Sequence, residues 1–109
     1  MSVIARAASG PLACEIRRIG VGDAVQLTGV VSSSATVTGN FRFVLKKSGP
    51  SGKSHVNQGN LFALAAGAEV NVSHVTINIQ PNDQAVVELF ATSSDGIACH
   101  ATATLALEL

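Results

Sequence analysis

The apolar residues of this chain recur at every second position over long stretches. In FRFVLKK, Phe41, Phe43 and Leu45 share one parity, and charged residues occupy part of the other. In GIACHATATLALEL the alternation continues from Ile97 to Leu107. A β-strand places successive side chains on opposite faces, so a period of two is typical of a strand with one buried face. The pattern therefore predicts a protein built of half-buried strands.

One segment changes its parity partway along. In EVNVSHVTINI, Val70 and Val72 share one parity, whereas the apolar positions from Val75 onward share the other. An extra residue in a strand shifts the alternation in this way. We predict a β-bulge or bend around Ser73 and His74.

Clusters of Gly, Pro, Asn, Asp and Ser separate the alternating runs, as in SGPSG, QPNDQ and SSDG. An Asp-Gly pair between two such runs favours a hairpin, because both residues tolerate positive φ. We predict an all-β fold of about seven antiparallel strands, near residues 12–18, 23–33, 36–47, 53–65, 69–80, 84–94 and 96–107. Short strands at this spacing are typical of an immunoglobulin-like β-sandwich with two sheets.

We expect a single immunoglobulin-like domain over residues 1–109, with an ordered core at about 11–108. A chain of this length can bury about two-thirds of the surface that its unfolded form exposes. The predicted core contains Phe41, Phe43, Val75, Ile77, Ile79, Leu89, Ile97 and Leu105.

The composition narrows the function. Charged residues make up 13% of the chain, the formal net charge at pH 7 is zero, and Trp and Tyr are absent. Nucleic-acid binding needs a basic surface and aromatic platforms, so we expect no nucleic-acid partner. No apolar run approaches the ~20 residues that span a membrane, which argues against membrane insertion. The start MSVIARAASG lacks the apolar run of a signal peptide, so we expect an exported protein to be present here as its mature chain.

The two cysteines, Cys14 and Cys99, both lie at apolar positions of predicted strands. One of these strands is the first of the predicted sandwich and the other is the last, so the two thiols could meet in the core. We predict a structural disulfide between them, which implies an oxidising compartment. The alternative is two separate buried thiols that pack as small hydrophobic residues.

No arrangement of residues typical of an enzyme stands out. His55, His74 and His100 lie on three different predicted strands, without a second His or Cys at metal-ligand spacing. Cys99 and His100 are adjacent, and adjacent residues of a strand point to opposite faces, which disfavours a Cys–His nucleophile. We expect no enzymatic activity, no metal site and no cofactor.

Two segments resemble a known family. SGPSGKSHVNQG is a Ser/Gly turn that leads into a polar, Gln-bearing strand, and VTINIQPNDQAVVELFATSSDG joins two alternating strands through a Pro-Asn-Asp turn. In the order and spacing of these features, over roughly residues 24–105, the chain resembles the curli assembly inhibitors, and most of all their branch outside the enteric bacteria. The resemblance implies a small periplasmic chaperone that stops curli subunits from forming amyloid too early.

The chain departs from that family at one point. Enteric members carry a Cys-x-Cys pair on an early strand, whereas the matching stretch here is Val37-Thr38-Gly39. The absence of this pair puts a redox role in doubt.

Four cations are candidate binding residues. Arg42, Lys46, Lys47 and Lys53 gather around the third and fourth predicted strands, whereas the acidic residues are spread along the chain. The resemblance implies a curli-type amyloid subunit as partner, and a local basic face could attract an acidic subunit despite zero net charge. A sandwich can also pair briefly with an amyloid-forming chain through a strand edge. The alternative is an ordinary solvated edge protected by lysines.

Two functions therefore remain open. We expect a monomeric periplasmic chaperone that inhibits amyloid assembly by weak, transient contact, at well below one molecule per subunit. The alternative is a structural or adhesive β-sandwich module of a bacterial surface assembly. Such a module should polymerise, or lack a strand that its neighbour donates.

Overall fold

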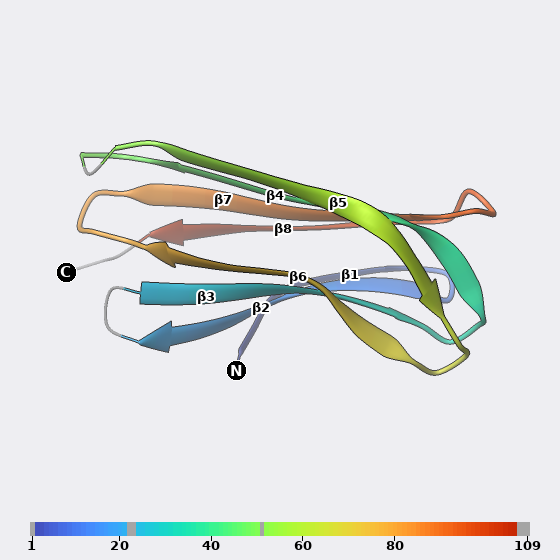
Figure 1. Cartoon of the computed structure of the whole chain (residues 1–109). Helices are drawn as coiled ribbons and strands as arrows, with labels where there is room; N and C mark the ends of the chain where they lie inside the picture. The colour runs from blue at the N-terminus through green and yellow to red at the C-terminus, as the bar shows by residue number, and fades with distance from the viewer. Residues whose placement is uncertain (1, 22–23, 51, 107–109) are drawn as a thin grey trace.

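A computed structural model describes residues 2–21, 24–50 and 52–106 as eight strands in two stacked layers (Figure 1). The strands are β1 (Ser2–Ser9), β2 (Leu12–Val21), β3 (Ala24–Ser33), β4 (Val37–Ser48), β5 (Ser54–Leu64), β6 (Glu69–Asn78), β7 (Gln84–Ser93) and β8 (Ala98–Ala106). These residues contain no helix long and apolar enough to cross a membrane.

The strands form two four-stranded sheets. The first sheet has the order β1-β2-β3-β6 and the second has the order β5-β4-β7-β8, with antiparallel pairing throughout. The connections β3–β4, β5–β6 and β6–β7 pass from one sheet to the other, so each sheet brings together strands that are distant in the sequence. The predicted all-β, two-sheet sandwich is confirmed, with eight strands in place of about seven.

The additional strand, β1, pairs with β2 from Ser2 to Ser9 and lies N-terminal to the expected core. Its apolar residues are mostly alanines, and its alternation is broken at Ile4. Val3 pairs with Arg17 and Ala5 with Ile16, so Ile4 is an extra residue in the ladder. A short alanine-rich run with a bulge gives a weak period of two, which explains why the pattern does not predict β1.

The other seven strands lie within three residues of their predicted limits, apart from predicted ends at 23 and 107, which lie outside the described residues. The parity change in β6 is also present, one residue earlier than predicted. Gly29 pairs with Ser73 and Val30 with Asn71, so Val72 is the extra residue.

The core lies between the two sheets. Six of the eight predicted core residues are buried, namely Phe43, Val75, Ile77, Ile79, Leu89 and Leu105. Phe41 and Ile97 are half-buried and pack against the same cluster. Ile97 lies in the turn before β8, where its carbonyl accepts a hydrogen bond from the Ser93 amide, and the end of the sheet leaves it partly open to solvent.

The predicted disulfide is present in the structure. Cys14 on β2 and Cys99 on β8 are bonded, with 5.9 Å between their Cα atoms. Both residues are buried. Because β2 belongs to the first sheet and β8 to the second, the bond joins the two layers directly.

Candidate binding surface on the second sheet

Alternation along β4 decides which cations reach solvent. Phe43 and Leu45 point into the core and are fully buried, so their neighbours on β4 point to the outer face of the second sheet. Arg42 and Lys46 are two of these neighbours, and both are exposed. The strand period thus places two of the four candidate cations on one open face.

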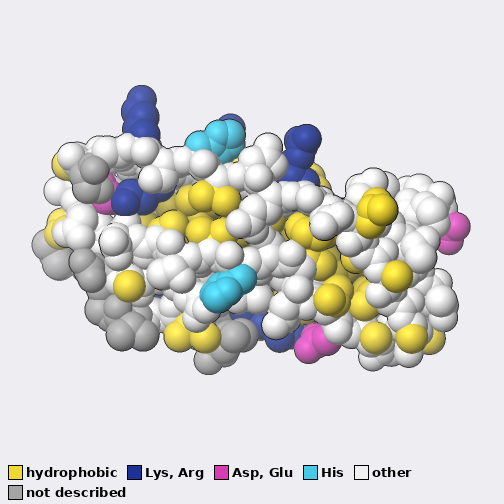
Figure 2. Space-filling model, viewed as in Figure 1, with side chains coloured by type: hydrophobic (Ala, Val, Ile, Leu, Met, Phe, Trp, Pro, Cys, Tyr) yellow, Lys and Arg dark blue, Asp and Glu magenta, His cyan; other side chains and the backbone are white. Residues whose placement is uncertain are grey.

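Lys53 joins this face at the end of the β4–β5 hairpin. It directly precedes β5, and Lys46 lies opposite His55 in the β4–β5 pairing. A hollow at this end of the sheet is lined by Lys46, Lys47, Ser48, Lys53, Ser54 and His55. Figure 2 shows Lys and Arg side chains projecting from the upper rim of the molecule, where β4 and β5 run in Figure 1. We call Arg42, Lys46 and Lys53 the basic face.

Lys47, the fourth candidate, is held inward. Its Nζ donates a hydrogen bond of 2.6 Å to the Asn78 carbonyl oxygen and lies 3.8 Å from Asp83 Oδ2. The Lys47 side chain is only 11% exposed and that of Asp83 is 0% exposed. Asp83 Oδ2 also accepts a hydrogen bond from the Gln80 amide. Lys47 therefore ties β4 to the β6–β7 turn, and it is not part of the exposed basic face.

Two arginines of the first sheet, Arg6 and Arg17, form ion pairs. Arg17 is bonded to Glu15 and Glu69, and Arg6 is bonded to Glu15. The pKa of Arg17 is raised above its ordinary value, chiefly by the side-chain hydrogen bond to Glu15. These charges largely neutralise one another. By contrast, no residue of the basic face forms an ion pair with a residue that the structure describes.

Apolar side chains accompany the basic face, and the sequence analysis did not identify them as part of it. Leu61, Val86 and Phe90 are exposed large hydrophobic residues of the second sheet. The Phe90 ring stacks on the His100 ring at a centroid distance of 4.2 Å. His100 Nε2 in turn lies 2.9 Å from Glu88 Oε2. For Leu61 the sequence could have predicted exposure. Phe62 and Leu64 have the parity of buried core residues, so the period of two places Leu61 on the opposite, outer face.

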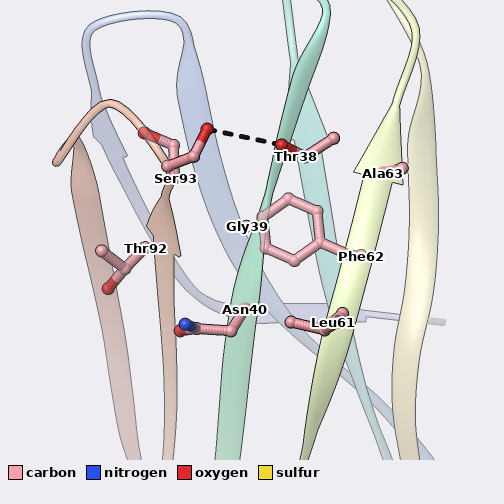
Figure 3. Close-up of a pocket in the computed structure, with 9 residues that line it drawn as sticks. Thr38, Gly39, Asn40, Leu61, Phe62, Ala63, Thr92 and Ser93 are labelled. Carbon is pink, nitrogen blue, oxygen red and sulfur yellow. Dashed lines mark hydrogen bonds between the residues drawn. The ribbon is translucent and has the colours of Figure 1, made fainter.

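A second hollow lies at the far end of β5 (Figure 3). In Figure 3 the Phe62 ring lies over β4 at Gly39, and Leu61 points along the outer surface toward Asn40. A Cβ atom on Gly39 would lie 2.1 Å from the Thr92 carbonyl oxygen, so the close approach of β4 and β7 requires glycine. The nine lining residues are Thr38, Gly39, Asn40, Leu61, Phe62, Ala63, Thr92, Ser93 and Ser94. Along β5 the sheet therefore has a basic end at Lys53 and an apolar end at Leu61, and Arg42 lies between them, opposite Gly59.

Two of the solved structures that resemble this fold come from proteins of R. palustris and E. coli. The solution structure of CsgH from R. palustris is 22% identical, with a TM-score of 0.64 over 82% of this chain and 89% of that chain. The E. coli curli protein CsgC is 16% identical, with a TM-score of 0.73 over 89% of this chain and 97% of that chain. At these identities the likeness shows a shared fold. No curated protein sequence matches the chain.

The family comparison goes further than the fold. The CsgH protein family matches residues 13–102, a range that includes both cysteines and the whole of the basic face. This match agrees with the resemblance found in the sequence. Because it covers most of the chain, the protein belongs to the CsgH family.

Proposed function

We propose that this protein is a periplasmic chaperone that inhibits premature amyloid assembly of curli-type subunits. The match to the CsgH family carries this proposal, and the fold shared with the curli protein CsgC supports it. The Cys14–Cys99 disulfide is compatible with a location outside the cytoplasm, because such bonds persist in oxidising compartments. We further propose that the protein acts as a monomer, by binding and not by catalysis.

The basic face supports contact with an acidic or polar partner. Arg42 and Lys46 are exposed on one face, Lys53 is exposed beside them, and none of the three is neutralised by a described carboxylate. Charges of this kind attract an oppositely charged chain at long range and raise its rate of encounter. They add little affinity in the complex, because exposed ion pairs are worth ~1 kcal/mol or less. Weak and transient contact follows from this arrangement.

Weak contact is sufficient if the target is rare. A binder that sequesters monomers has to match its target mole for mole. A protein that acts on nuclei or growing fibril ends meets only a small fraction of the subunits. We therefore expect this protein to delay fibril formation of a curli subunit at well below one molecule per subunit, without a stable complex with the monomer. Dye-monitored fibril growth over a range of added protein measures the delay, and lag times that stay unchanged up to equimolar protein would refute the proposal.

The triple variant Arg42→Glu, Lys46→Glu, Lys53→Glu should inhibit less than the natural protein. Lys47 is left in place because it is bonded to the β6–β7 turn. Exposed substitutions seldom change stability by more than ~0.5 kcal/mol, so the fold should persist. High salt should weaken the natural protein in the same direction, because exposed charges are screened beyond ~8 Å at physiological ionic strength.

A matched pair of single reversals separates the basic face from net charge. Lys46→Glu and Arg18→Glu change the net charge equally, and both side chains are exposed, but Arg18 lies on the first sheet. We expect Lys46→Glu to shorten the lag time and Arg18→Glu to leave it unchanged. Equal effects of the two variants would discard the basic face and keep only a general role for charge.

A further inference from the structure

We propose that the free edge of β5 is a docking strand for an extended polypeptide segment rich in Asn and Gln. The docked segment would add a fifth strand to the second sheet beside β5. The inference rests on the proposed function for its natural partner, which would be the amyloid-forming subunit. It adds the contact surface on this chain and the chemistry of the segment that fits it.

Among the four edge strands of the sandwich, β5 is both regular and uncovered. In the first sheet, β1 and β6 each have a register shift, at Ile4 and Val72, and bulges of this kind protect an edge from further pairing. In the second sheet, β8 lies against β1 and is bonded to β2 by the disulfide. By contrast, β5 pairs with β4 without a register shift over all of its 11 residues. Of the strands that the structure describes, only β4 is hydrogen-bonded to β5 within a sheet.

The composition of β5 also leaves its edge open. Natural proteins protect edge strands with Lys, Pro or inward-pointing charges. From Val56 to Leu64, β5 has no charged residue and no proline. Every residue from Asn57 to Leu61 is exposed. An edge strand presents alternate N–H and C=O groups away from its sheet, and here no charge or proline interrupts them.

Three kinds of side chain follow one another along this edge. Lys53 and His55 stand at the start, at the hollow that they share with Lys46. Amide side chains occupy the middle, with Asn57 on the outer face of the sheet and Gln58 and Asn60 on the side of Phe62 and Leu64. Leu61, which is 77% exposed, stands at the end, beside the second hollow. At ~3.3 Å per residue, the distance from the basic end to the apolar end is about 26 Å.

The order of basic, amide and apolar side chains along β5 indicates which residues a docked segment should carry. Asn and Gln side chains form ladders with identical groups on a neighbouring strand, as they do in stacked amyloid strands. An acidic residue at one end of the segment would face Lys53, and an apolar residue at the other end would cover Leu61. The main-chain hydrogen bonds would supply affinity, and the side chains at the two ends would supply register.

Two internal hydrogen bonds use polar groups of β5 when no segment is bound, one at the Leu61 amide and one at the Gln58 side chain. Asn60 Oδ1 accepts a hydrogen bond of 2.8 Å from the Leu61 amide. Ser73 Oγ on β6 donates to Gln58 Oε1. A segment that pairs at Leu61, or that takes up the Gln58 amide group, has to replace these bonds. Their replacement lowers the net gain on docking, which agrees with weak, reversible contact.

The direct test uses a synthetic peptide of about eight residues, with blocked ends, Asp at one end, Gln and Asn in the middle, and Leu at the other end. The isotope-labelled full chain is titrated with this peptide and followed by amide NMR shifts. We expect shifts centred on residues 53–64 and on 38–40. The same peptide N-methylated at every backbone nitrogen should cause none, because it keeps every side chain and loses the main-chain donors of both edges. Shifts centred on β6 or β8, or equal binding of the N-methylated peptide, would overturn the inference.

A pair of double variants tests the edge from the protein side. Asn57→Lys with Ala63→Lys places two charges at exposed outer-face positions of β5, and Thr102→Lys with Thr104→Lys places the same charge at exposed outer-face positions of β8. The β5 variant should lose about tenfold or more of its affinity for the peptide, because lysines block edge pairing. The β8 variant should bind as well as the natural chain, or slightly better. Attraction by charge alone would instead strengthen binding in both variants, since the peptide is acidic, and that result would overturn the inference.

Fibril assays with the same proteins separate this inference from the proposed function. If the natural chain delays fibril growth and the β5 variant delays it equally, the chaperone function stands and docking at β5 is wrong. If the natural chain docks the peptide at β5 but leaves fibril growth unchanged, the docking strand stands and the proposed function is wrong. Loss of inhibition in the β5 variant alone supports both.

Discussion

Replacing Cys14 and Cys99 together by Ala should lower the free energy of unfolding by about 4–5 kcal/mol. The bond joins residues 85 positions apart, and closing so long a loop removes much conformational entropy from the unfolded chain in the loop-entropy description. The loss would be a large part of the ~5–15 kcal/mol that stabilises a typical domain. Urea unfolding of the double variant and of the natural protein measures the difference.

Single variants, reduction and alkylation test this expectation further. Each single Cys→Ala variant should lose about as much as the double variant, because either change breaks the bond. Reduction of the natural protein should have a comparable effect. A loss below ~1 kcal/mol would contradict the prediction, as would two alkyl groups added to the denatured protein without a reductant.

Lys47→Met should destabilise the domain by about 3 kcal/mol, whereas Lys46→Met should change its stability by less than ~0.5 kcal/mol. The two lysines are neighbours on β4, and Met keeps the length of the stem in both. Lys47 is bonded inward to the Asn78 carbonyl and to buried Asp83, whereas Lys46 lies in solvent. Lys47→Met removes a cation that lies 3.8 Å from the fully buried Asp83 carboxylate, and weakening a buried ion pair costs far more than losing an exposed charge does. Thermal and urea unfolding of the two variants gives the comparison.

A second substitution tests this explanation. Adding Asp83→Asn to Lys47→Met removes the buried charge and keeps an oxygen that can accept the hydrogen bond from Gln80. We expect the double variant to recover part of the lost stability. Equal losses for Lys46→Met and Lys47→Met, or no recovery in the double variant, would show that the Lys47–Asp83 pair contributes little.

The same pair of lysines illustrates what a single sequence can reveal. The period of two identifies strands because burial on one face is a local property of each strand, and seven of the eight strands follow from it. The same period places Lys47 on the side of Phe43 and Leu45, so its inward position could have been predicted from parity. The partner of Lys47, Asp83, could not have been predicted from parity, because the contact between β4 and the β6–β7 turn depends on how the two sheets stack.

The position of a strand within its sheet is a second property that the sequence alone does not predict. Nothing in the segment SHVNQGNLFAL indicates whether it lies at an edge or in the middle of a sheet, because both positions allow the same alternation. Only the strand order assigns β5 one neighbour, and only the pairing registers show that its edge is regular. The predicted binding residues are therefore limited to cations: parity could have identified Leu61 as an exposed side chain, but its place on a free edge, like that of the β5 amides, requires the structure.

The position of the disulfide has a consequence for how the chain is made. Synthesis proceeds from the N-terminus, so Cys14 leaves the ribosome long before Cys99, which lies 85 residues later. Meanwhile β7 lacks β8, its neighbour at that edge of the sheet, and contacts between such distant segments form slowly. During this interval Cys14 is a free thiol that can form mixed disulfides with other proteins or small thiols. A thiol oxidoreductase can therefore form the native bond only once Cys99 has been synthesised.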